Sequence, residues 1–408
     1  MIINENKLEE TKIKGNYIIW SIIIFLSVLS VLVVYSASLV ENYNNGSAER
    51  TLLKHIIILL LGLAAIFFIQ KTDYRKLLLL ANFMIWVTVI LLGITMFFGK
   101  EVNDARRTIQ ILGLSFQPSE LAKVTIAIYL AKILTVSREK VEQSFKSFLI
   151  VMLPVFLSIA FIAKENLSTG LLISAMVGIM LFFGKVKWSY IFMVIGAIIL
   201  LFLLYIAMAK LFPDIIDEGR IGTWIKRIGT WIQSIGASQS ELENTDDIDN
   251  YQKLLGIDAI KNGRFFGKMP GRGVLLYSLP YASNDFIFDI IVEEYGFLMS
   301  LVVVFMYVIL LYRAIVIATK APQTFGAFLA IGLMLNIVIQ VFAHIGVNVG
   351  LLPVTGIPLP FVSKGGSSML MMSIAIGLIL SVANRLLSEK DDQHKDTKQL
   401  KEIKLLEE

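Results

Sequence analysis

The chain has 408 residues, of which 56% are hydrophobic and only 17% are charged. Because soluble domains are about 45–50% apolar, this composition excludes an ordinary soluble protein and indicates an integral membrane protein. The formal net charge of +5 is explained by basic loops beside anionic lipid, so it does not predict nucleic-acid binding. Cysteine is absent, which excludes disulfides and thiolate metal sites.

Ten apolar segments reach the length of about 20 residues that a membrane-spanning helix needs. In chain order they are 17–39, 52–70, 77–98, 118–137, 147–164, 167–184, 189–212, 286–317, 326–347 and 366–386. An even number of spans places both termini on the same side of the membrane. Lysine and arginine are concentrated in alternate short loops and in the C-terminal tail, so we expect both termini to be cytoplasmic.

Three parts are expected along the chain: a cytoplasmic N-terminal segment (1–16), a transmembrane domain (17–386) and a charged cytoplasmic tail (387–408). The long polar insertion, residues 213–285, falls between the seventh and eighth spans and is predicted to be external. Within it, "RIGTWIKRIGTWIQ" (220–233) has the apolar spacing of an amphipathic helix. This helix either lies on the outer leaflet or packs on its own protein.

The first of three unusual external loops runs from 103 to 124 and ends in "QPSELAK". Pro118 suits the first turn of a helix. Glu120 and Lys123 then share one helix face at i, i+3, so they can form an ion pair. Charges inside a membrane span are costly, which favours a functional role, but a structural salt bridge that positions helices explains the pair equally well.

The second external loop ends in "AIKNGRFFGKMPGRGVLLYSLPYASNDFIF" (259–288), in which cations alternate with glycines. Glycine permits close approach of the backbone, and the cations supply charge for a phosphate or pyrophosphate. Attraction to lipid headgroups is the alternative. Four carboxylates then stand among apolar residues at the start of the eighth span: Asp285, Asp289, Glu293 and Glu294.

The third external loop, "NVGLLPVTGIPLPFVSKGGSSML" (348–370), is apolar and contains three prolines. We expect it to enter the protein at membrane depth, where non-helical backbone is tolerated only if it is buried or lines a cavity. The "GGSS" run that opens the last span either binds an anion through its N–H groups or caps the helix. In the ninth span, polar residues spaced by four predict interhelical hydrogen bonds rather than catalysis: Asn336, Gln340, His344 and Asn348.

Three segments together resemble the signature segments of the SEDS family, the FtsW, RodA and SpoVE proteins: "RRTIQILGLSFQPSELAK", "GRFFGKMPG…LPYASNDFIFDIIVEEYGF" and "GLLPVTGIPLPFVSKGGSS". The resemblance covers residues 17–386, and "ENLST" and "SKGGSS" are most similar to FtsW-type proteins. It implies an all-α polytopic membrane protein with one large extracytoplasmic loop. It also implies a glycosyltransferase that polymerises lipid II into β-1,4 glycan strands at the outer face of the cytoplasmic membrane. Division is the expected role, with elongation as the alternative.

The resemblance also implies roles for individual residues. Asp285 matches the family's essential aspartate, which would act as general base on the acceptor 4-hydroxyl in an inverting displacement; simple N-capping of the eighth span is the alternative. Glu120 and Lys123 match the family's charge pair. The expected pyrophosphate- or substrate-binding residues are Arg106, Arg107, Lys268, Lys364, Gly365, Gly366, Ser367 and Ser368.

A divalent cation, Mg²⁺ or Mn²⁺, is the candidate cofactor, and no organic cofactor is expected. Its candidate ligands are Asp285, Asp289 and Glu293, which lie on one helix face at i, i+4 and i+8. Asp289 and Glu293 could instead raise the pKa of Asp285 by repulsion. Expected partners are lipid II, the growing lipid-linked glycan, a class B penicillin-binding transpeptidase and other division proteins of the membrane, but no nucleic acid.

Departures from the family pattern are informative. Asn166 stands where an aspartate is frequent, so that acid cannot be essential here, and Lys364 replaces a frequent tyrosine and adds a cation. Two rival functions are a lipid II flippase and a non-catalytic division scaffold. We find no internal repeat of the kind many transporters have, and the unusual charges cluster at one face, which favours the transferase.

Overall fold

The protein is described by a computed structural model covering residues 16–41, 48–102, 105–111, 114–196, 229–232, 248–273, 282–353 and 355–386. Within these ranges seven helices are long and apolar enough to cross a membrane. They are α2 (Asn16–Glu41), α3 (Ala48–Ile69), α4 (Arg75–Phe98), α7 (Phe145–Glu165), α15 (Ile287–Lys320), α16 (Thr324–Asn348) and the C-terminal helix (Ser367–Leu386). The predicted polytopic helical fold is confirmed.

Of the three remaining expected spans, two are present as helices and one is described only in part. Two further helices, α5 (Pro118–Val136) and α8 (Leu167–Phe183), coincide with the fourth and sixth expected spans. Of the seventh, residues 188–196 are described and helical. The count of ten therefore stays a prediction. The expected amphipathic helix lies outside the described residues except for the helical turn 229–232.

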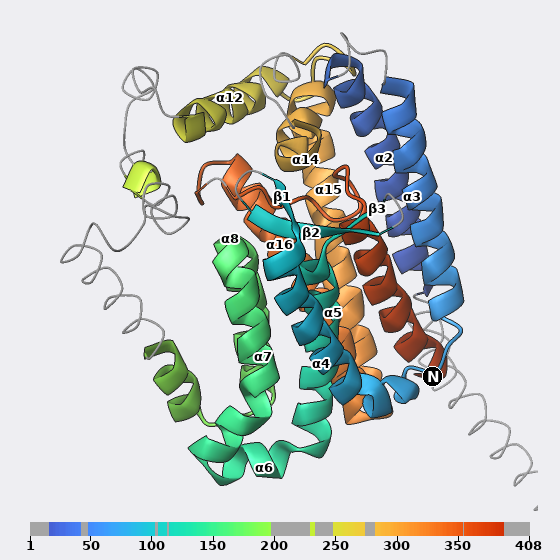
Figure 1. The fold of residues 1–408 in the computed structure, drawn as a ribbon. Helices are drawn as coiled ribbons and strands as arrows, with labels where there is room; N and C mark the ends of the chain where they lie inside the picture. Colours follow the sequence, from blue (N-terminus) through green and yellow to red (C-terminus); the bar gives the residue numbers. More distant parts are fainter. Residues whose placement is uncertain are drawn as a thin grey trace, which may run out of the picture.

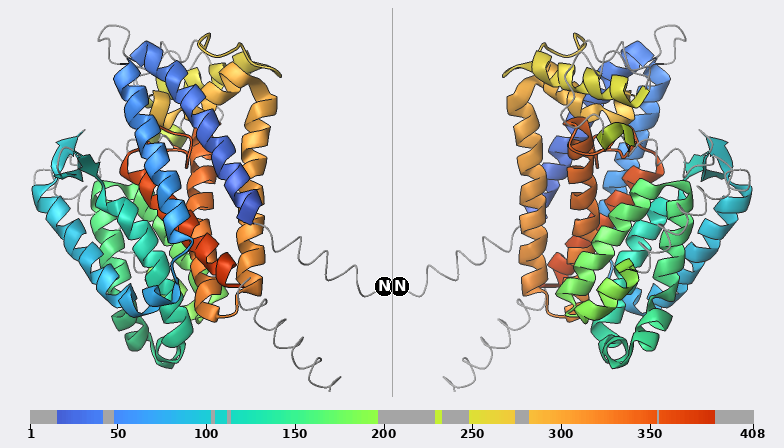
Figure 2. Two further views of the ribbon diagram at one scale, coloured as in Figure 1. Left: turned by 90° about the vertical axis from the view of Figure 1, so that its right-hand side faces the viewer. Right: turned by 90° about the vertical axis from the view of Figure 1, so that its left-hand side faces the viewer.

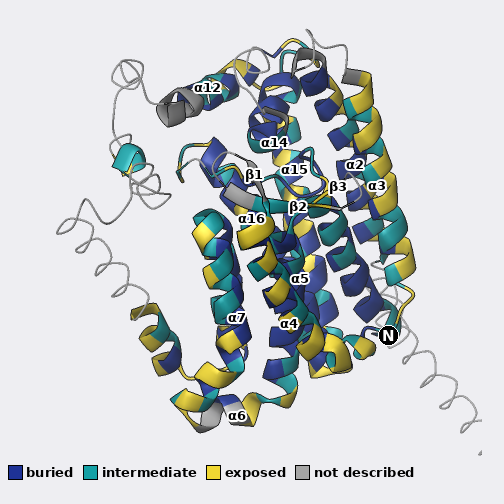
Figure 3. Ribbon diagram, viewed as in Figure 1, coloured by how far each residue is buried: buried dark blue, intermediate teal, exposed yellow. Residues whose placement is uncertain are grey.

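α5 and α16 form the centre of the bundle. α5 is apolar on nearly all sides, and most of its side chains are buried between α4, α16, α7 and α8, as expected of a helix that is hydrophobic all round. The outer helices expose large apolar residues such as Phe83 (69%) and Phe98 (83%), consistent with contact with lipid. Figure 3 shows this division between buried inner faces and exposed outer faces.

A small antiparallel sheet connects α4 to α5, where the sequence predicted a loop. Its strands are β1 (Lys100–Val102), β2 (Ala105–Ile111) and β3 (Leu114–Phe116), in the order β1-β2-β3. Ile109 pairs with Phe116 across β2 and β3. The alternation of β-branched and polar residues in "TIQI" favours this strand. The sheet carries Arg107 to the start of α5.

The three unusual loops lie at one end of the bundle (Figures 1 and 2). This end also holds α12 (Ile248–Gly263), a helix of the long polar insertion that packs on α15, and α14 (Ala282–Asp285). The short helix α6 (Arg138–Gln143) lies at the opposite end. Residues 349–366, which join α16 to the C-terminal helix, return into the bundle, and we call them the re-entrant segment.

Candidate active site

Asp285 lies where a short helix meets the start of α15. α14 ends at Asp285, and Phe286 occupies the N-cap position of α15 without a side-chain capping bond. Asp285 is therefore not the N-cap residue, which argues against the capping alternative. Its half-buried carboxylate lies against the re-entrant segment, because Oδ2 is 3.4 Å from the place that a Cβ on Gly356 would occupy.

Gly356 itself has φ +60, a left-handed conformation that glycine adopts without strain. The residue before Asp285 is also tied to the same segment. The Ser363 hydroxyl donates to the carbonyl oxygen of Asn284 at 2.8 Å and accepts from the Leu359 N–H at 2.8 Å. Asp285 is thus placed by the re-entrant segment on two sides.

The re-entrant segment is held by side chains of the surrounding helices. Four of its carbonyl oxygens accept hydrogen bonds from α2, α15 and α16. The pairs are Ser30 with Val362 (2.7 Å), Gln340 with Pro358 (2.8 Å), His344 with Ile357 (2.6 Å) and Tyr307 with Pro360. These bonds satisfy buried backbone that has no secondary structure. The predicted burial is confirmed for residues 357–363, whereas Val349, Leu351, Leu352 and Gly356 are exposed.

The predicted ion pair of α5 is present and buried. Lys123 Nζ lies 2.8 Å from Glu120 Oε2, with side-chain exposures of 4% and 6%. Lys123 also donates to Gln340 Oε1 at 2.7 Å, so the pair joins α5 to α16. The interhelical role predicted for the polar stripe of α16 is confirmed by this bond, and that stripe also bonds the re-entrant segment.

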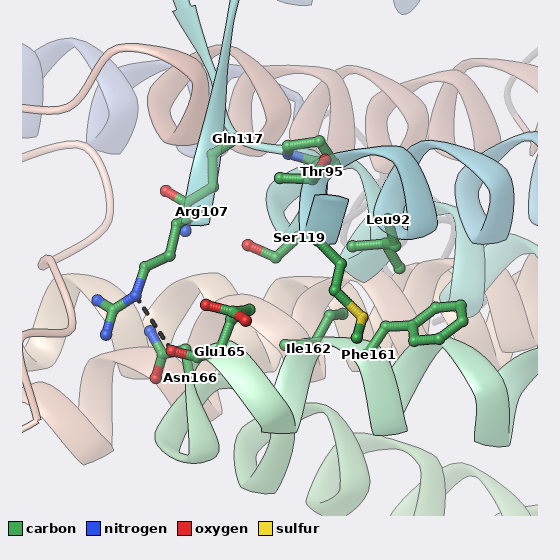
Figure 4. A pocket seen from close by; sticks show the side chains of 11 residues that line it. Leu92, Thr95, Arg107, Gln117, Ser119, Phe161, Ile162, Glu165 and Asn166 are labelled. Carbon is green, nitrogen blue, oxygen red and sulfur yellow. Dashed lines mark hydrogen bonds between the residues drawn. The ribbon is translucent and has the colours of Figure 1, made fainter. Parts of the chain in front are cut away.

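A small pocket opens between β2, α4, α5, α7 and α8 (Figure 4). Its polar lining residues are Thr95, Arg107, Gln117, Ser119, Glu165 and Asn166, and its apolar ones include Leu92, Met96, Phe161 and Ile162. Arg107 Nε donates to the Glu165 carbonyl oxygen at 3.2 Å, which fixes the guanidinium at the pocket. The sequence predicted Arg107 but none of the other polar lining residues as part of a site.

Asn166 has a clear structural role at this pocket. Its side-chain oxygen accepts from the Thr169 N–H at 3.2 Å, so it is the N-cap of α8. An asparagine caps a helix about as well as an aspartate. The structure therefore gives a local reason why an amide can stand at the position where relatives frequently have an acid.

The predicted anion-binding run lies where the re-entrant segment becomes the C-terminal helix. Ser367 Oγ accepts from the Gln117 N–H at 3.2 Å, which ties this helix to the start of α5 beside the pocket. Lys364 is half-buried and within electrostatic range of the buried His55 of α3. Gly365 and Gly366 precede the helix. Of Arg106, the structure describes only the backbone, in β2.

The carboxylates that follow Asp285 have different partners. Glu293 pairs with Lys268 at 3.1 Å, and the fully buried Asp289 lies against Gly256 of α12. No group of three or more His, Asp or Glu side chains among the described residues is placed to hold a metal ion. The described arrangement therefore gives no support to a three-carboxylate metal site, and the divalent cation stays a prediction.

The glycine-rich part of the second loop packs against a break in α15 and forms backbone hydrogen bonds there. Gly296 interrupts this helix with φ 83 and ψ 174. The N–H groups of Lys268 and Met269 donate to the carbonyls that end the first half, and the Phe297 N–H donates to the Arg264 carbonyl at 3.0 Å. A Cβ on Gly296 would lie 2.4 Å from the Phe265 oxygen. The close backbone approach seen here is to α15, Lys268 forms an ion pair with Glu293, and the phosphate contact stays a prediction.

Comparisons with known proteins identify relatives of this chain. The family model described as cell cycle protein, which groups FtsW, RodA and SpoVE, matches residues 16–387. A probable peptidoglycan glycosyltransferase FtsW of Coxiella burnetii is 30% identical over 393 residues, covering 92% of this chain and 98% of that protein. Stage V sporulation protein E of Bacillus subtilis is 29% identical over 371 residues, covering 89% and 95%.

Two solved structures are similar in fold. One is a chain from a structure that describes the structural coordination of polymerization and crosslinking by a peptidoglycan synthase complex. It matches with a TM-score of 0.68 and 23% identity, and the match covers 90% of this chain and 98% of that one. The rod shape determining protein RodA of Thermus thermophilus matches with a TM-score of 0.60, 22% identity and coverage of 89% and 95%. These likenesses support the fold.

Proposed function

Because the chain belongs to the FtsW, RodA and SpoVE family of cell cycle proteins, we propose that it is a membrane peptidoglycan glycosyltransferase that polymerises lipid II. Several relatives carry the name probable peptidoglycan glycosyltransferase FtsW, which favours a role in division over elongation. The observation that carries the proposal is the half-buried Asp285 carboxylate, which lies on the re-entrant segment and is not the N-cap of α15.

The reaction needs a base and a stabilised leaving group. A lipid-linked α-glycosyl pyrophosphate becomes a β-1,4 linkage, so configuration inverts and one displacement suffices. Asp285 would remove the proton from the acceptor 4-hydroxyl as its oxygen attacks the anomeric carbon, an effect typically worth about 10²–10⁴-fold. The departing pyrophosphate already carries negative charge, so it requires cations rather than an acid.

Arg107 is the best-placed described residue for the pyrophosphate, because it lines a pocket beside the start of α5. A guanidinium offers paired donors that match phosphate oxygens. Lys364 and Arg106 are further candidates. A divalent cation would enter with the pyrophosphate rather than on a protein carboxylate cluster. Chelation with EDTA, followed by return of Mg²⁺ or Mn²⁺, tests whether polymerisation depends on it.

The proposed setting follows from the substrates. Both are anchored in the bilayer, so a reactive carboxylate at the mouth of a membrane helix suits them. We place this end of the bundle outside the cytoplasmic membrane at the division septum, with both termini in the cytoplasm. A class B penicillin-binding transpeptidase is the expected partner, and the fold match to a chain of a peptidoglycan synthase complex supports that pairing.

The direct test reconstitutes the purified protein with its cognate transpeptidase and lipid II, and detects glycan strands on a gel. Wild-type protein should polymerise, and Asp285→Asn should lose activity by about 10²-fold or more while remaining folded. Asp258→Asn is the matched control, because it removes an exposed carboxylate of α12 at the same end. Full activity of Asp285→Asn would contradict the assigned base.

The rival functions predict different results. In the same preparation, a flippase would move labelled lipid II across liposomes and make no glycan. In cells, a division scaffold would support growth with Asp285→Asn as well as with the wild-type chain.

A further inference from the structure

Two side chains on one face of α16 hold two successive carbonyl groups of the re-entrant segment. Gln340 Nε2 donates to the Pro358 oxygen at 2.8 Å, and His344 Nδ1 donates to the Ile357 oxygen at 2.6 Å. Both side chains are about 1% exposed. The next residue towards the N-terminus is Gly356, which lies against the Asp285 carboxylate. The two bonds therefore fix the backbone directly beside the candidate base.

The hydrogen-bonding partners determine the orientation of the Gln340 amide and the tautomer of the His344 ring. Lys123 can only donate and a carbonyl can only accept, so Gln340 must turn its oxygen to Lys123 and its nitrogen to Pro358. Likewise the Ile357 carbonyl requires a hydrogen on His344 Nδ1, which leaves Nε2 to accept from Asn348 Nδ2 at 2.8 Å. The arrangement has a single hydrogen-bonding solution.

A continuous set of contacts thus runs from the buried ion pair to the base. Glu120 holds Lys123 at 2.8 Å, and Lys123 holds Gln340 at 2.7 Å. Gln340 then bonds the re-entrant segment two residues from Gly356. Sequence spacing predicts a polar face on α16, but it does not indicate that this face bonds a segment beside Asp285.

We propose that Gln340 and His344 are positioning residues for Asp285, and that the Glu120–Lys123 pair acts on the reaction through Gln340. This inference rests on the proposed function, in which Asp285 is the general base. The two side chains set the place of Gly356 and hence of the backbone beside the carboxylate. A displacement of about 1 Å at a reacting group can cost about 10²-fold in rate, so loss of either bond should lower turnover.

Two conservative variants isolate these bonds. Gln340→Glu keeps the shape and the acceptor for Lys123 but removes the donor to Pro358. His344→Leu removes the donor to Ile357, whereas His344→Asn places an amide nitrogen near the position of Nδ1 and should restore the bond. Asn336→Met, one turn earlier on the same stripe, is the matched control for loss of a buried polar group on α16.

The measurement is lipid II polymerisation by the reconstituted complex. We expect Gln340→Glu and His344→Leu to lower kcat about 10- to 100-fold with little change in KM, because neither residue binds substrate. His344→Asn should recover most of the activity, and Asn336→Met should retain it. Equal kcat per folded molecule in His344→Leu, His344→Asn and wild type would overturn the proposal, and so would wild-type kcat in Gln340→Glu.

A second readout is independent of activity. The chain has no cysteine, so Thr355→Cys provides a single label in the re-entrant segment. Its alkylation by a maleimide should become faster in the Gln340→Glu background, and an unchanged rate counts against the proposal. If wild-type protein makes no glycan, the proposed function fails, whereas the alkylation result still decides whether Gln340 holds the segment. If Gln340→Glu does not accumulate, the His344 pair gives the same test.

Discussion

The re-entrant segment and the Arg107 pocket lie at the same end of the bundle, but they are stabilised in different ways (Figures 1 and 4). In the segment, buried side chains from α2, α15 and α16 bond four carbonyl oxygens. In the pocket, polar side chains from β2 and from α4, α5, α7 and the N-cap of α8 line an opening together with apolar side chains. In the re-entrant segment the polar groups bond one another, whereas in the pocket polar side chains face an open space.

This difference assigns a different task to each region. A general base must be held in a fixed place, because proton transfer depends steeply on geometry. A subsite for a charged, hydrated group instead needs donors that a ligand can reach. We therefore expect that Asp285 must be held in a fixed position and that Arg107 must be accessible to the ligand. Substitutions in the first region should lower stability or kcat, and those in the second should mainly raise KM.

The largest expected effect comes from breaking the buried ion pair. Lys123→Met leaves Glu120 buried without its cation, and removing one partner of a buried pair typically costs about 3–5 kcal/mol in the free energy of unfolding. Lys123→Met combined with Glu120→Leu should recover most of that loss. Thermal unfolding in detergent measures both variants. A single variant as stable as wild type would show that Glu120 is not effectively buried.

The pocket should respond in the opposite way. Arg107→Met should leave the unfolding temperature nearly unchanged but raise KM for lipid II about 10- to 100-fold, because hydrogen bonds to charged groups contribute about 1.5–3 kcal/mol. Arg107→Lys should fall between, since it keeps the charge and loses the planar fork. Polymerisation rates over a range of lipid II concentrations give the comparison. A fall in kcat without a change in KM would instead indicate that Arg107 acts in catalysis rather than in substrate binding.

Local features of the site were predictable from the sequence. The pair Glu120–Lys123 follows from an i, i+3 spacing on one helix, and Pro118 does begin α5. The burial of residues 357–363 of the re-entrant segment follows from their apolar, proline-containing composition. In each case the pattern and its consequence lie within a few residues of each other, so no knowledge of the tertiary fold is required.

Features that depend on breaks in the helices were not predictable. The sequence indicated that Asp285 and Asp289 share one continuous helix, but α14 ends at Asp285 and α15 starts at Ile287. Glu293 then meets Lys268 because Gly296 interrupts α15 and admits the glycine-rich loop. The partners of Gln340 were also hidden, because periodicity gives the face of a helix but not what packs on it.

The smallest expected effect concerns Asn166, the N-cap of α8 beside the pocket. Asn166→Ala should lower the free energy of unfolding by about 1 kcal/mol, the usual cost of losing such a cap. Asn166→Asp keeps an acceptor for the Thr169 N–H and adds a negative charge at a helix N-terminus, which is favourable by about 0.3–1 kcal/mol. Thermal unfolding of the three chains ranks them.

Activity of the same Asn166 variants refines the comparison of the two regions. If the acid that relatives frequently have here only caps α8, Asn166→Asp should polymerise lipid II as fast as the wild-type chain. A carboxylate beside Arg107 would also compete with a pyrophosphate for the guanidinium. A higher KM in Asn166→Asp without a change in kcat would therefore support pyrophosphate binding at the pocket. A higher kcat would instead indicate that the pocket, and not Asp285 alone, takes part in catalysis.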